Sequence, residues 1–241
     1  MLNRARRTAA LILALTAAGW GTGTATAAVE PAPQTVLVCG DSMMKTVVHA
    51  LARELESLPS VRVAPLISIG TGLARPDVFD WPAQLREALK ARPAAAVVLL
   101  GANDEQPLRV ATGAPAPVST PAWNAEYAAR VAAMLRLLTA AGVKPIVWVG
   151  LPDMRDPGSQ ANGRRINAIV QNACAGVPDV EFLDTVAMFS RTAGVYSAYV
   201  FDARGMPLTV RASDGIHLNA AGADRLARAL REKLVPRLTG Q

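Results

Sequence analysis

The sequence is poor in the residues that build metal centres and disulfide frameworks. Its 241 residues include two cysteines, Cys39 and Cys174, and two histidines, His49 and His217. No CxxC or HExxH pattern occurs, so a zinc site has no obvious ligand set and we expect no metal. A disulfide stays open, because Cys39 ends an apolar, strand-like run where a small buried hydrophobe fits equally well.

Long apolar runs, aromatic residues and nucleotide-binding motifs are also scarce. No stretch reaches the roughly 18 unbroken apolar residues of a spanning helix, so we expect no membrane span in the mature chain. GxGxxG and GKS or GKT phosphate loops are absent, and we expect no cofactor. Aromatic residues make up 5% of the chain and no apolar helical lid is evident, which disfavours a long-chain lipase.

The formal net charge of +6 does not indicate nucleic-acid binding. Three arginines within residues 4–7 precede an apolar run over residues 9–18, and small residues follow as far as Ala27. This order is typical of a secretory signal peptide, so we expect residues 1–27 to be removed, with residues 28–34 as a short linker. Without those arginines the charge falls from +6 to +3, and the remaining basic residues are dispersed among acids. We therefore expect a periplasmic or secreted protein with no nucleic-acid partner.

Strand and helix patterns alternate along residues 35–238, which we interpret as one domain. This alternation predicts a parallel sheet with helices on both faces, and ligands bind beyond the carboxyl ends of such strands. A hairpin formed by residues 195–201 and 207–211 is expected before the last helix, and residues 106–120 are expected to form a loop. The predicted strands cover residues 36–39, 61–69, 94–100, 143–149 and 180–183, and the predicted helices cover residues 44–58, 81–91, 121–141 and 160–173.

Ser42 is the candidate nucleophile. It stands in Gly40-Asp41-Ser42, directly after the first predicted strand and at the start of a helix. Asp and Ser are favoured helix caps, so the motif fits an ordinary helix start as well. At this position, however, backbone N–H groups and the positive end of the helix dipole suit a developing oxyanion.

A serine nucleophile needs a base, and the two histidines are the candidates. His49 follows Ser42 on the same predicted helix, about 10 Å along its axis at 1.5 Å per residue, which is too far for proton transfer. His217 lies in Asp214-Gly215-Ile216-His217, just before the last helix. The Asp214 carboxylate can hold Nδ1 of His217 and leave Nε2 for the serine, although the segment also fits a plain helix entry.

Two further strand ends offer donors for an oxyanion. The side-chain amide of Asn103 follows the third strand, and Gly70-Thr71-Gly72 follows the second. A glycine N–H can approach a substrate without an intervening Cβ, and of Gly70 and Gly72 we favour Gly72. Each segment alone fits a loop turn. Their conjunction at the strand ends of one sheet favours a catalytic site.

The set Ser42, Gly72, Asn103 and His217 resembles the SGNH hydrolases, also called GDSL-type esterases and lipases. The resemblance covers essentially the whole mature chain, from GDS near its start through GAND to DGIH near its end. Residues 70–82 look like those of a periplasmic bacterial subset whose substrates are mostly unassigned. Met43 stands where the common motif has Leu.

The resemblance implies a three-layer α/β/α sandwich, flavodoxin-like, with a parallel sheet of five strands in the order 2-1-3-4-5. It also implies acyl transfer through the triad Ser42, His217 and Asp214. In that chemistry the N–H groups of Ser42 and Gly72 and the amide of Asn103 hold the oxyanion.

Two activities fit such a site. One is a periplasmic esterase that removes small acyl groups, acetyl above all, from envelope or exported glycans. The other is an O-acyltransferase that uses the same triad on a polysaccharide or peptidoglycan acceptor. A non-catalytic glycan-binding module is disfavoured by the intact triad.

Chain reach keeps Arg75 and Arg211 near the triad, and we expect both to border the cleft and bind the acylated glycan. The sequence does not predict the oligomeric state.

Overall fold

The structure of the protein is a computed structural model that describes residues 33–110, 113–192 and 194–240. The predicted signal peptide, residues 1–27, and the linker up to residue 32 lie outside the described residues, so both stay predictions. The strands are β1 (Gln34–Gly40), β2 (Val61–Ile67), β3 (Ala95–Leu99), β4 (Leu108–Arg109), β5 (Pro115–Ala116), β6 (Ile146–Val149), β7 (Val180–Leu183), β8 (Tyr199–Phe201) and β9 (Pro207–Thr209). The helices are α1 (Ser42–Leu55), α2 (Trp81–Leu89), α3 (Pro121–Ala140), α4 (Pro157–Cys174), α5 (Val186–Phe189) and α6 (Ala220–Leu238).

Five of these strands form one parallel sheet in the order β2-β1-β3-β6-β7. Numbered along the sheet-forming strands, this is the expected order 2-1-3-4-5, so the flavodoxin-like topology is confirmed. β3 lies at the centre, and all five of its residues are buried, as expected of a strand covered on both faces. The first three strands end close together because Gly40 pairs with Ile67 on one side and with Leu99 on the other.

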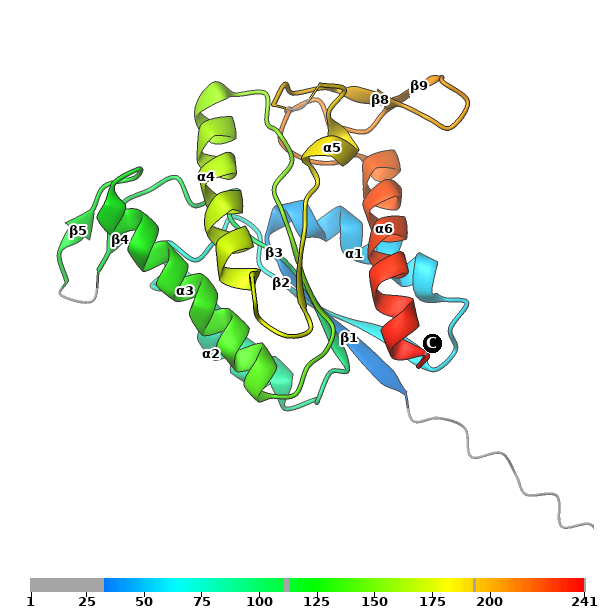
Figure 1. Cartoon of the computed structure of the whole chain (residues 1–241), viewed down its shortest axis with the longest axis horizontal. Helices are drawn as coiled ribbons and strands as arrows, with labels where there is room; N and C mark the ends of the chain where they lie inside the picture. The colour runs from blue at the N-terminus through cyan, green and yellow to red at the C-terminus, as the bar shows by residue number, and fades with distance from the viewer. Residues whose placement is uncertain (1–32, 111–112, 193, 241) are drawn as a thin grey trace, which may run out of the picture. The chain divides into compact units, whose positions relative to one another are not determined.

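Helices cover both faces of this sheet and complete the three layers (Figure 1). α1 packs against α6, while α3 packs against both α2 and α4. The apolar residues of α1 recur at helical spacing, and its buried stripe includes Met44, Val47, Leu51 and Leu55. The expected α/β/α sandwich is therefore confirmed, and its loops after β1, β2 and β3 emerge at one end of the sheet.

Both cysteines are free and buried, so the disulfide left open above does not form in the structure. Cys39 is in β1 and Cys174 ends α4, where each packs as a small apolar side chain. Burial raises the pKa of the Cys39 thiol to about 12 and that of Cys174 to about 11. Both groups are therefore protonated thiols at neutral pH.

Four elements differ from the sequence expectation: β4, β5, the start of α4, and α5. The segment expected as a loop over residues 106–120 contains the antiparallel pair β4 and β5. α4 begins at Pro157 rather than at residue 160, because the Asp156 side chain accepts from the N–H of Ser159 and caps the helix. The one-turn helix α5 has no sequence prediction. The hairpin expected before the last helix is present as β8 and β9.

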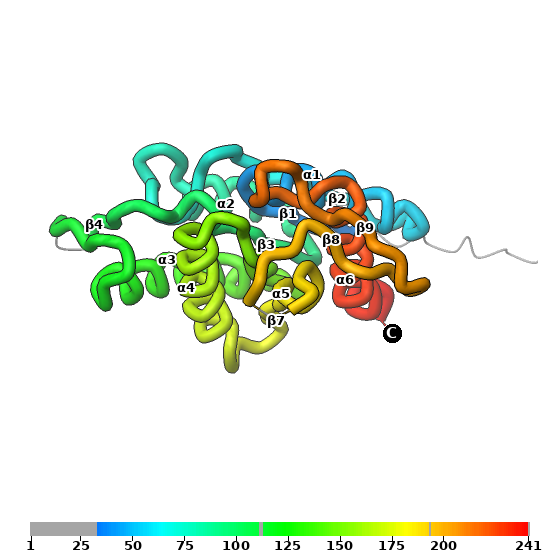
Figure 2. Tube along the Cα trace, turned by 90° about the horizontal axis from the view of Figure 1, so that it is seen from above, coloured from blue at the N-terminus to red at the C-terminus, as the bar shows by residue number. Residues whose placement is uncertain are grey.

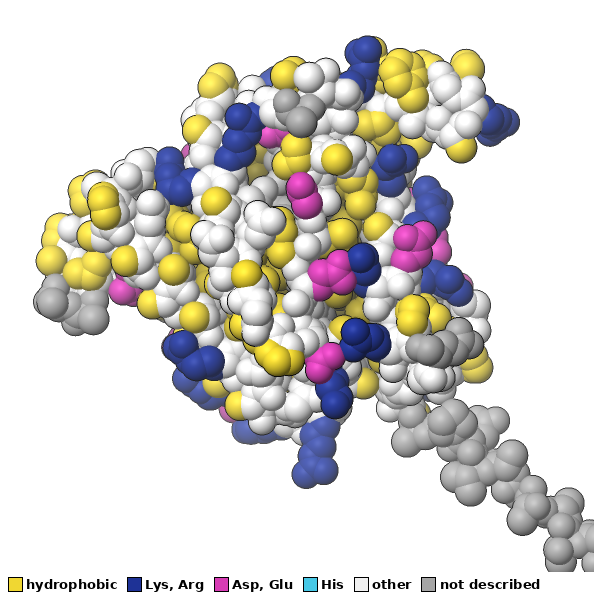
Figure 3. Space-filling model, in the orientation of Figure 1, with side chains coloured by type: hydrophobic (Ala, Val, Ile, Leu, Met, Phe, Trp, Pro, Cys, Tyr) yellow, Lys and Arg dark blue, Asp and Glu magenta, His cyan; other side chains and the backbone are white. Residues whose placement is uncertain are grey.

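The surface agrees with the dispersed charge of the sequence. Figure 3 shows Lys and Arg side chains scattered over the displayed face among Asp and Glu side chains, without a continuous basic stripe. Within the described part of the chain, no helix combines the length and apolar character needed to cross a membrane.

Candidate active site

Three side chains from the two ends of the domain sequence meet in a hydrogen-bonded row. The Ser42 Oγ lies 2.8 Å from Nε2 of His217, and Nδ1 of His217 lies 2.8 Å from Oδ2 of Asp214. Ser42 and His217 are 175 positions apart in sequence. The segment before α6 passes close to α1 in the view of Figure 2, and the contact with Ser42 places His217 at the start of α1. This geometry matches a nucleophile, a base and an orienting carboxylate.

The position of Ser42 follows from how α1 begins. Asp41 is the N-cap, and its Oδ1 accepts from the N–H of Met43 at 2.8 Å. This contact fixes the first turn, in which Ser42 is the first residue. The N–H of Ser42 has no acceptor among the described residues. It is therefore free to donate to a substrate oxygen.

Asp214 holds His217 through the main chain as well as the ring. Its Oδ1 accepts from the N–H of Ile216 at 2.7 Å and from the N–H of His217 at 2.9 Å. Desolvation raises the pKa of Asp214, but these two hydrogen bonds and the His217 ring outweigh it and lower the pKa to about 2. Asp214 is thus a carboxylate over the whole working range of an imidazole base, which favours the Nδ1–H tautomer of His217.

Residues 213–217, which we call the catalytic segment because they contain the two proposed catalytic residues Asp214 and His217, form a turn. Two arginines from other parts of the chain bind the carbonyls of this turn. Gly215 has φ +79°, and a Cβ at this position would meet the Cβ of Arg155 at 2.6 Å. The N–H of Arg155 donates to the Gly215 carbonyl at 3.0 Å, and its guanidinium donates to the Ser213 carbonyl at 2.9 Å. The second arginine, Arg211, donates to the Ile216 carbonyl at 2.8 Å. Both arginines donate to carbonyl oxygens and not to Asp214. The Asp214 carboxylate is therefore available to accept from His217.

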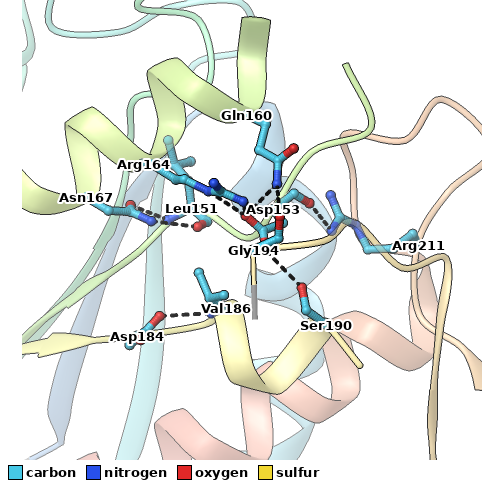
Figure 4. A network of polar contacts seen from close by, with 10 residues as sticks. All are labelled: Leu151, Asp153, Gln160, Arg164, Asn167, Asp184, Val186, Ser190, Gly194 and Arg211. Atoms are coloured by element: carbon cyan, nitrogen blue, oxygen red, sulfur yellow. Dashed lines mark hydrogen bonds and ion pairs between the residues drawn. The ribbon is translucent and has the colours of Figure 1, made fainter. Parts of the chain in front are cut away.

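Arg211 does not lie at the surface of the cleft, where the sequence had placed it. It is 3% exposed, and its guanidinium donates to the Asp153 carbonyl at 2.6 Å and packs 5.1 Å from the ring centroid of Tyr196. Figure 4 shows this side chain pointing at Asp153. Chain reach correctly put Arg211 near the triad, but its two terminal guanidinium nitrogens donate to main-chain carbonyls, while its Nε is buried without a partner among the described residues. The expectation of a substrate contact is therefore corrected to a structural contact with the catalytic segment.

Asp153 is the hub of the network in Figure 4. Its carboxylate is fully buried and accepts from Gln160, from Arg164 and, at 3.2 Å, from the Ser190 hydroxyl. Arg164 comes from α4, and Ser190 follows α5. The loop after β6 is thereby fixed to two helices. Arg211 connects this loop to the catalytic segment, because its guanidinium donates to the carbonyls of both Asp153 and Ile216.

The expected oxyanion donors also come together. The Asn103 amide donates to Asp41 Oδ2 at 3.2 Å and to the Thr71 carbonyl at 3.0 Å. These two contacts place Asn103 between the neighbour of Ser42 and the neighbour of Gly72. The N–H of Gly72, like that of Ser42, has no acceptor among the described residues.

Of the two candidate glycines, Gly72 fits the site better. Gly70 is exposed, has φ +73°, and would carry a Cβ into open space. Gly72 is buried, and a Cβ there would lie 2.1 Å from Oδ1 of Asp104. The close packing of backbone against the Asp104 carboxylate requires a glycine at residue 72.

Comparisons with known proteins agree with this architecture. A family model described as a protein of unknown function, DUF459, matches residues 35–233. The chain belongs to the DUF459 family. No curated protein matches it. Solved structures with a similar fold include a family 3 carbohydrate esterase from Talaromyces cellulolyticus, with TM-score 0.59, 14% identity and coverage of 86% of this chain and 99% of that chain.

Two further neighbours of the DUF459 chain have related descriptions. An acetyl esterase variant solved with acetate ion gives TM-score 0.59 at 14% identity, covering 86% of this chain and 99% of that chain. A family two carbohydrate esterase from Clostridium thermocellum, solved in complex with cellohexaose, gives TM-score 0.54 at 17% identity, covering 87% of this chain and 67% of that chain. At these identities the likeness establishes the fold. The fold that the resemblance to the SGNH hydrolases implies is thereby confirmed.

Residues 70–74 of the DUF459 chain form the loop after β2, which we call the oxyanion loop because it contains the proposed donor Gly72. Sequence reasoning missed the residues that hold this loop. Asp104 is fully buried and accepts from the N–H of Leu73 at 3.0 Å and of Ala74 at 2.8 Å. The Tyr127 hydroxyl donates to the same carboxylate at 2.8 Å. The Arg130 guanidinium donates to the Leu73 carbonyl at 2.7 Å. Hydrogen bonds therefore fix the loop through its N–H groups and through its carbonyls.

The remaining predicted residues lie at the surface. Arg75 forms an ion pair with Asp77 through two hydrogen bonds of 2.8 and 2.6 Å, and its side chain is 47% exposed. His49 lies on the exposed side of α1, and no described contact connects its ring to Ser42. His217 is therefore the histidine that the fold delivers to Ser42.

Proposed function

We propose that the protein is a serine esterase that hydrolyses small acyl esters, acetyl above all, on envelope or exported glycans. The observation that carries the proposal is the continuous row from Ser42 through His217 to Asp214, with both contacts at 2.8 Å. A helix cap needs no histidine at the serine hydroxyl, so this row distinguishes a nucleophile from the ordinary reading of the GDS motif.

The mechanism follows from the donors and acceptors of the site. Ser42 Oγ forms a bond to the ester carbonyl carbon while Nε2 of His217 accepts the hydroxyl proton. Collapse of the tetrahedral intermediate breaks the bond to the alcohol oxygen, and His217 returns the proton to that oxygen. Water then attacks the acyl-serine with His217 as base again, which releases the carboxylic acid and restores the Ser42 hydroxyl. Asp214 stays ionised throughout and stabilises the imidazolium.

The oxyanion of each intermediate would be held by the N–H groups of Ser42 and Gly72. The amide of Asn103 becomes a third donor when it exchanges its hydrogen bond to Asp41 or to the Thr71 carbonyl for one to the oxyanion. Loss of one such donor typically costs about 3 to 4 kcal/mol of activation free energy. The two backbone donors have no acceptor among the described residues, so they need no rearrangement before they bind. Preorganised donors of this kind supply most of the electrostatic stabilisation in acyl transfer.

The substrate class and location rest on independent support. Proteins of similar fold include carbohydrate esterases and an acetyl esterase solved with acetate ion. Residues 1–27 have the order of a signal peptide, which favours the periplasm or the exterior as the place of action. Polysaccharides that carry O-acetyl groups are the substrates that this combination suggests.

Covalent labelling and turnover test the proposal together. A fluorophosphonate should add once to the wild-type protein and not to Ser42→Ala, as read by intact mass, because an activated serine reacts with such reagents. Acetate release from acetylated polysaccharides should disappear in Ser42→Ala and in His217→Ala. The matched control, His49→Ala, should keep activity within a few fold, since His49 lies on the exposed side of α1.

Three outcomes would contradict the assignment. Labelling that survives Ser42→Ala would place the reactive group elsewhere, and loss of activity in folded His49→Ala would mean a different base. Acetyl transfer to an added glycan, in preference to acetate release, would make the enzyme the acyltransferase that the sequence left open.

A further inference from the structure

A groove of about 520 Å³ opens beside the oxyanion loop. Its volume lies within the roughly 300–1,000 Å³ of typical ligand sites. One wall is formed by residues 74–77, after the oxyanion glycine, and the other by residues 106–109, after the oxyanion asparagine. Arg130 and Pro115 complete the lining.

Both walls of the groove start at the proposed oxyanion donors. Ala74 is two residues beyond Gly72, which limits their Cα separation to about 7 Å. On the other wall the Gln106 side chain donates to the Asn103 carbonyl at 3.2 Å. A substrate whose carbonyl oxygen is held by Gly72 and Asn103 therefore has its remaining part within reach of this groove.

The charged groups of the lining are mainly cationic, although most of the exposed lining area is apolar. Arg75, Arg109 and Arg130 contribute guanidinium groups, whereas Asp77 contributes the one carboxylate among the lining residues. Arg130 is committed to Glu126 and to main-chain carbonyls, so it shapes the wall. The apolar part of the lining comes from Ala74, Leu108 and three prolines, and none of the described lining residues is aromatic.

The two other arginines are available to a ligand. Arg109 is exposed, and its guanidinium has one contact among the described residues, to the Gly113 carbonyl at 3.3 Å. Arg75 is held by Asp77, but the side chains are 47% and 64% exposed, and exposed pairs of this kind contribute little stability. A stronger acceptor can therefore draw Arg75 away from Asp77 at small cost.

We propose that this groove binds the carrier of the acyl group through its acidic substituents, so that the preferred substrate is an acylated glycan bearing carboxylates. Arg75 and Arg109 donate to the carboxylate through their forked N–H groups. Asp77 competes with the substrate for Arg75. The inference rests on the proposed esterase function and names the class of its substrate.

Matched substrates separate recognition of charge from catalysis. The acidic probe is an O-acetylated glucuronate oligosaccharide, and its neutral counterpart has each carboxylate reduced to a hydroxymethyl group. Arg75→Ala and Arg109→Ala should each raise KM for the acidic probe about tenfold, since a charge-assisted hydrogen bond is lost. Turnover of the neutral probe and of phenyl acetate should be unchanged. Arg204→Ala, on the β8–β9 hairpin with a side chain 90% exposed, is the control and should leave every value unchanged.

Substitution of the competing carboxylate should have the opposite sign. Asp77→Asn releases Arg75, so KM for the acidic probe should fall about threefold, while kcat on phenyl acetate stays the same. A merely structural Arg75–Asp77 pair would give equal losses in both variants and on all substrates. Equal losses of this kind, or no effect of Arg75→Ala and Arg109→Ala on the acidic probe, would overturn the groove assignment.

Calorimetry of a catalytically silent protein tests the groove independently of the reaction. The non-acetylated glucuronate oligosaccharide should bind Ser42→Ala protein, more weakly with added salt and about tenfold more weakly after Arg109→Ala. Absence of binding would overturn the groove assignment even in an active esterase. Binding in a wild-type protein that neither labels at Ser42 nor turns over any ester would instead refute the proposed function.

Discussion

Gly72, the proposed oxyanion donor, shows at the level of one residue how close packing determines the residue type. A methyl group on this residue would occupy the place of the Asp104 carboxylate, and that carboxylate also holds the next two N–H groups of the loop. The buried acceptor and the small residue therefore depend on each other.

We expect Gly72→Ala to reduce kcat on phenyl acetate by about 100-fold or more, because displacement of the loop removes one oxyanion donor. Overpacking against Asp104 should also lower the free energy of unfolding by about 1–3 kcal/mol. Enzyme kinetics and denaturant unfolding measure the two effects. Gly70→Ala is the control, since its Cβ meets open space and its cost is strain at φ +73°. Loss of activity in Gly70→Ala with retention in Gly72→Ala would reverse the assignment.

Asp41 should make stability depend on pH in the acidic range. Burial, followed by the nearby Asp104 charge, raises its pKa to about 7 from 3.8, against hydrogen bonds that lower it. Because the folded pKa lies above the ordinary value, ionisation disfavours the folded state. The contribution to stability is present below about pH 4 and is lost as the pH rises to about 7.

The difference in unfolding free energy between wild type and Asp41→Asn should therefore vary with pH. We expect a slope of about 1.4 kcal/mol per pH unit between pH 4 and 7 and none above, measured by urea unfolding at each pH. A difference that is constant over this range would show that Asp41 keeps an ordinary pKa.

Side chains from other elements help to determine the conformation of the catalytic segment before α6. Arg155 and Arg211 bind its carbonyls, and Arg211 connects it to the loop after β6. Nothing in the local sequence of DGIH specifies these donors. The segment is therefore positioned by these tertiary contacts together with its own turn, in which the N–H of Ala212 donates to the His217 carbonyl and Asp214 accepts from two backbone N–H groups.

We expect Arg211→Lys to lower kcat about 10- to 100-fold with little change in KM, because an ammonium cannot replace a fork that binds two separated carbonyls. Misplaced His217 should also slow fluorophosphonate labelling of Ser42 in the same proportion. Steady-state kinetics and labelling rates check this, with Arg204→Lys as the control. An increase in KM alone would support the substrate contact first expected for Arg211.

The elements that the sequence predicted and those that it missed differ in the range of their interactions. β1, β3 and α1 carry continuous or periodic apolar residues, so local pattern and burial agree. Asp214 and His217 are three positions apart and could be paired from spacing. The contact of Tyr127 with Asp104 spans 23 positions and that of Arg130 with Leu73 spans 57. Such contacts have no local signature, because the fold alone brings their partners together.

At the scale of the whole molecule, the sheet order explains why distant motifs could be combined in advance. Parallel strands deliver all their carboxyl ends to one edge, so residues after β1, β2 and β3 converge whatever their separation in the chain. Arg211 was predicted less well than Ser42 because edge position fixes where a residue lies but not which way its side chain points.

The amino-terminal residues 1–27 predict that the protein is exported. The basic, apolar and small-residue order of residues 1–27 should direct secretion with cleavage near Ala27 or Ala28. Amino-terminal sequencing of the protein recovered from the periplasm or the medium checks this. An intact Met1 on exported material would contradict it.

The buried thiols of Cys39 and Cys174 give the protein an independence from its redox surroundings. A protonated thiol inside a packed core neither attacks a disulfide nor meets an oxidant readily, so once the protein is folded neither residue is a ready target of oxidation. The folded state contains both residues as free thiols, so its stability does not depend on a bond between them.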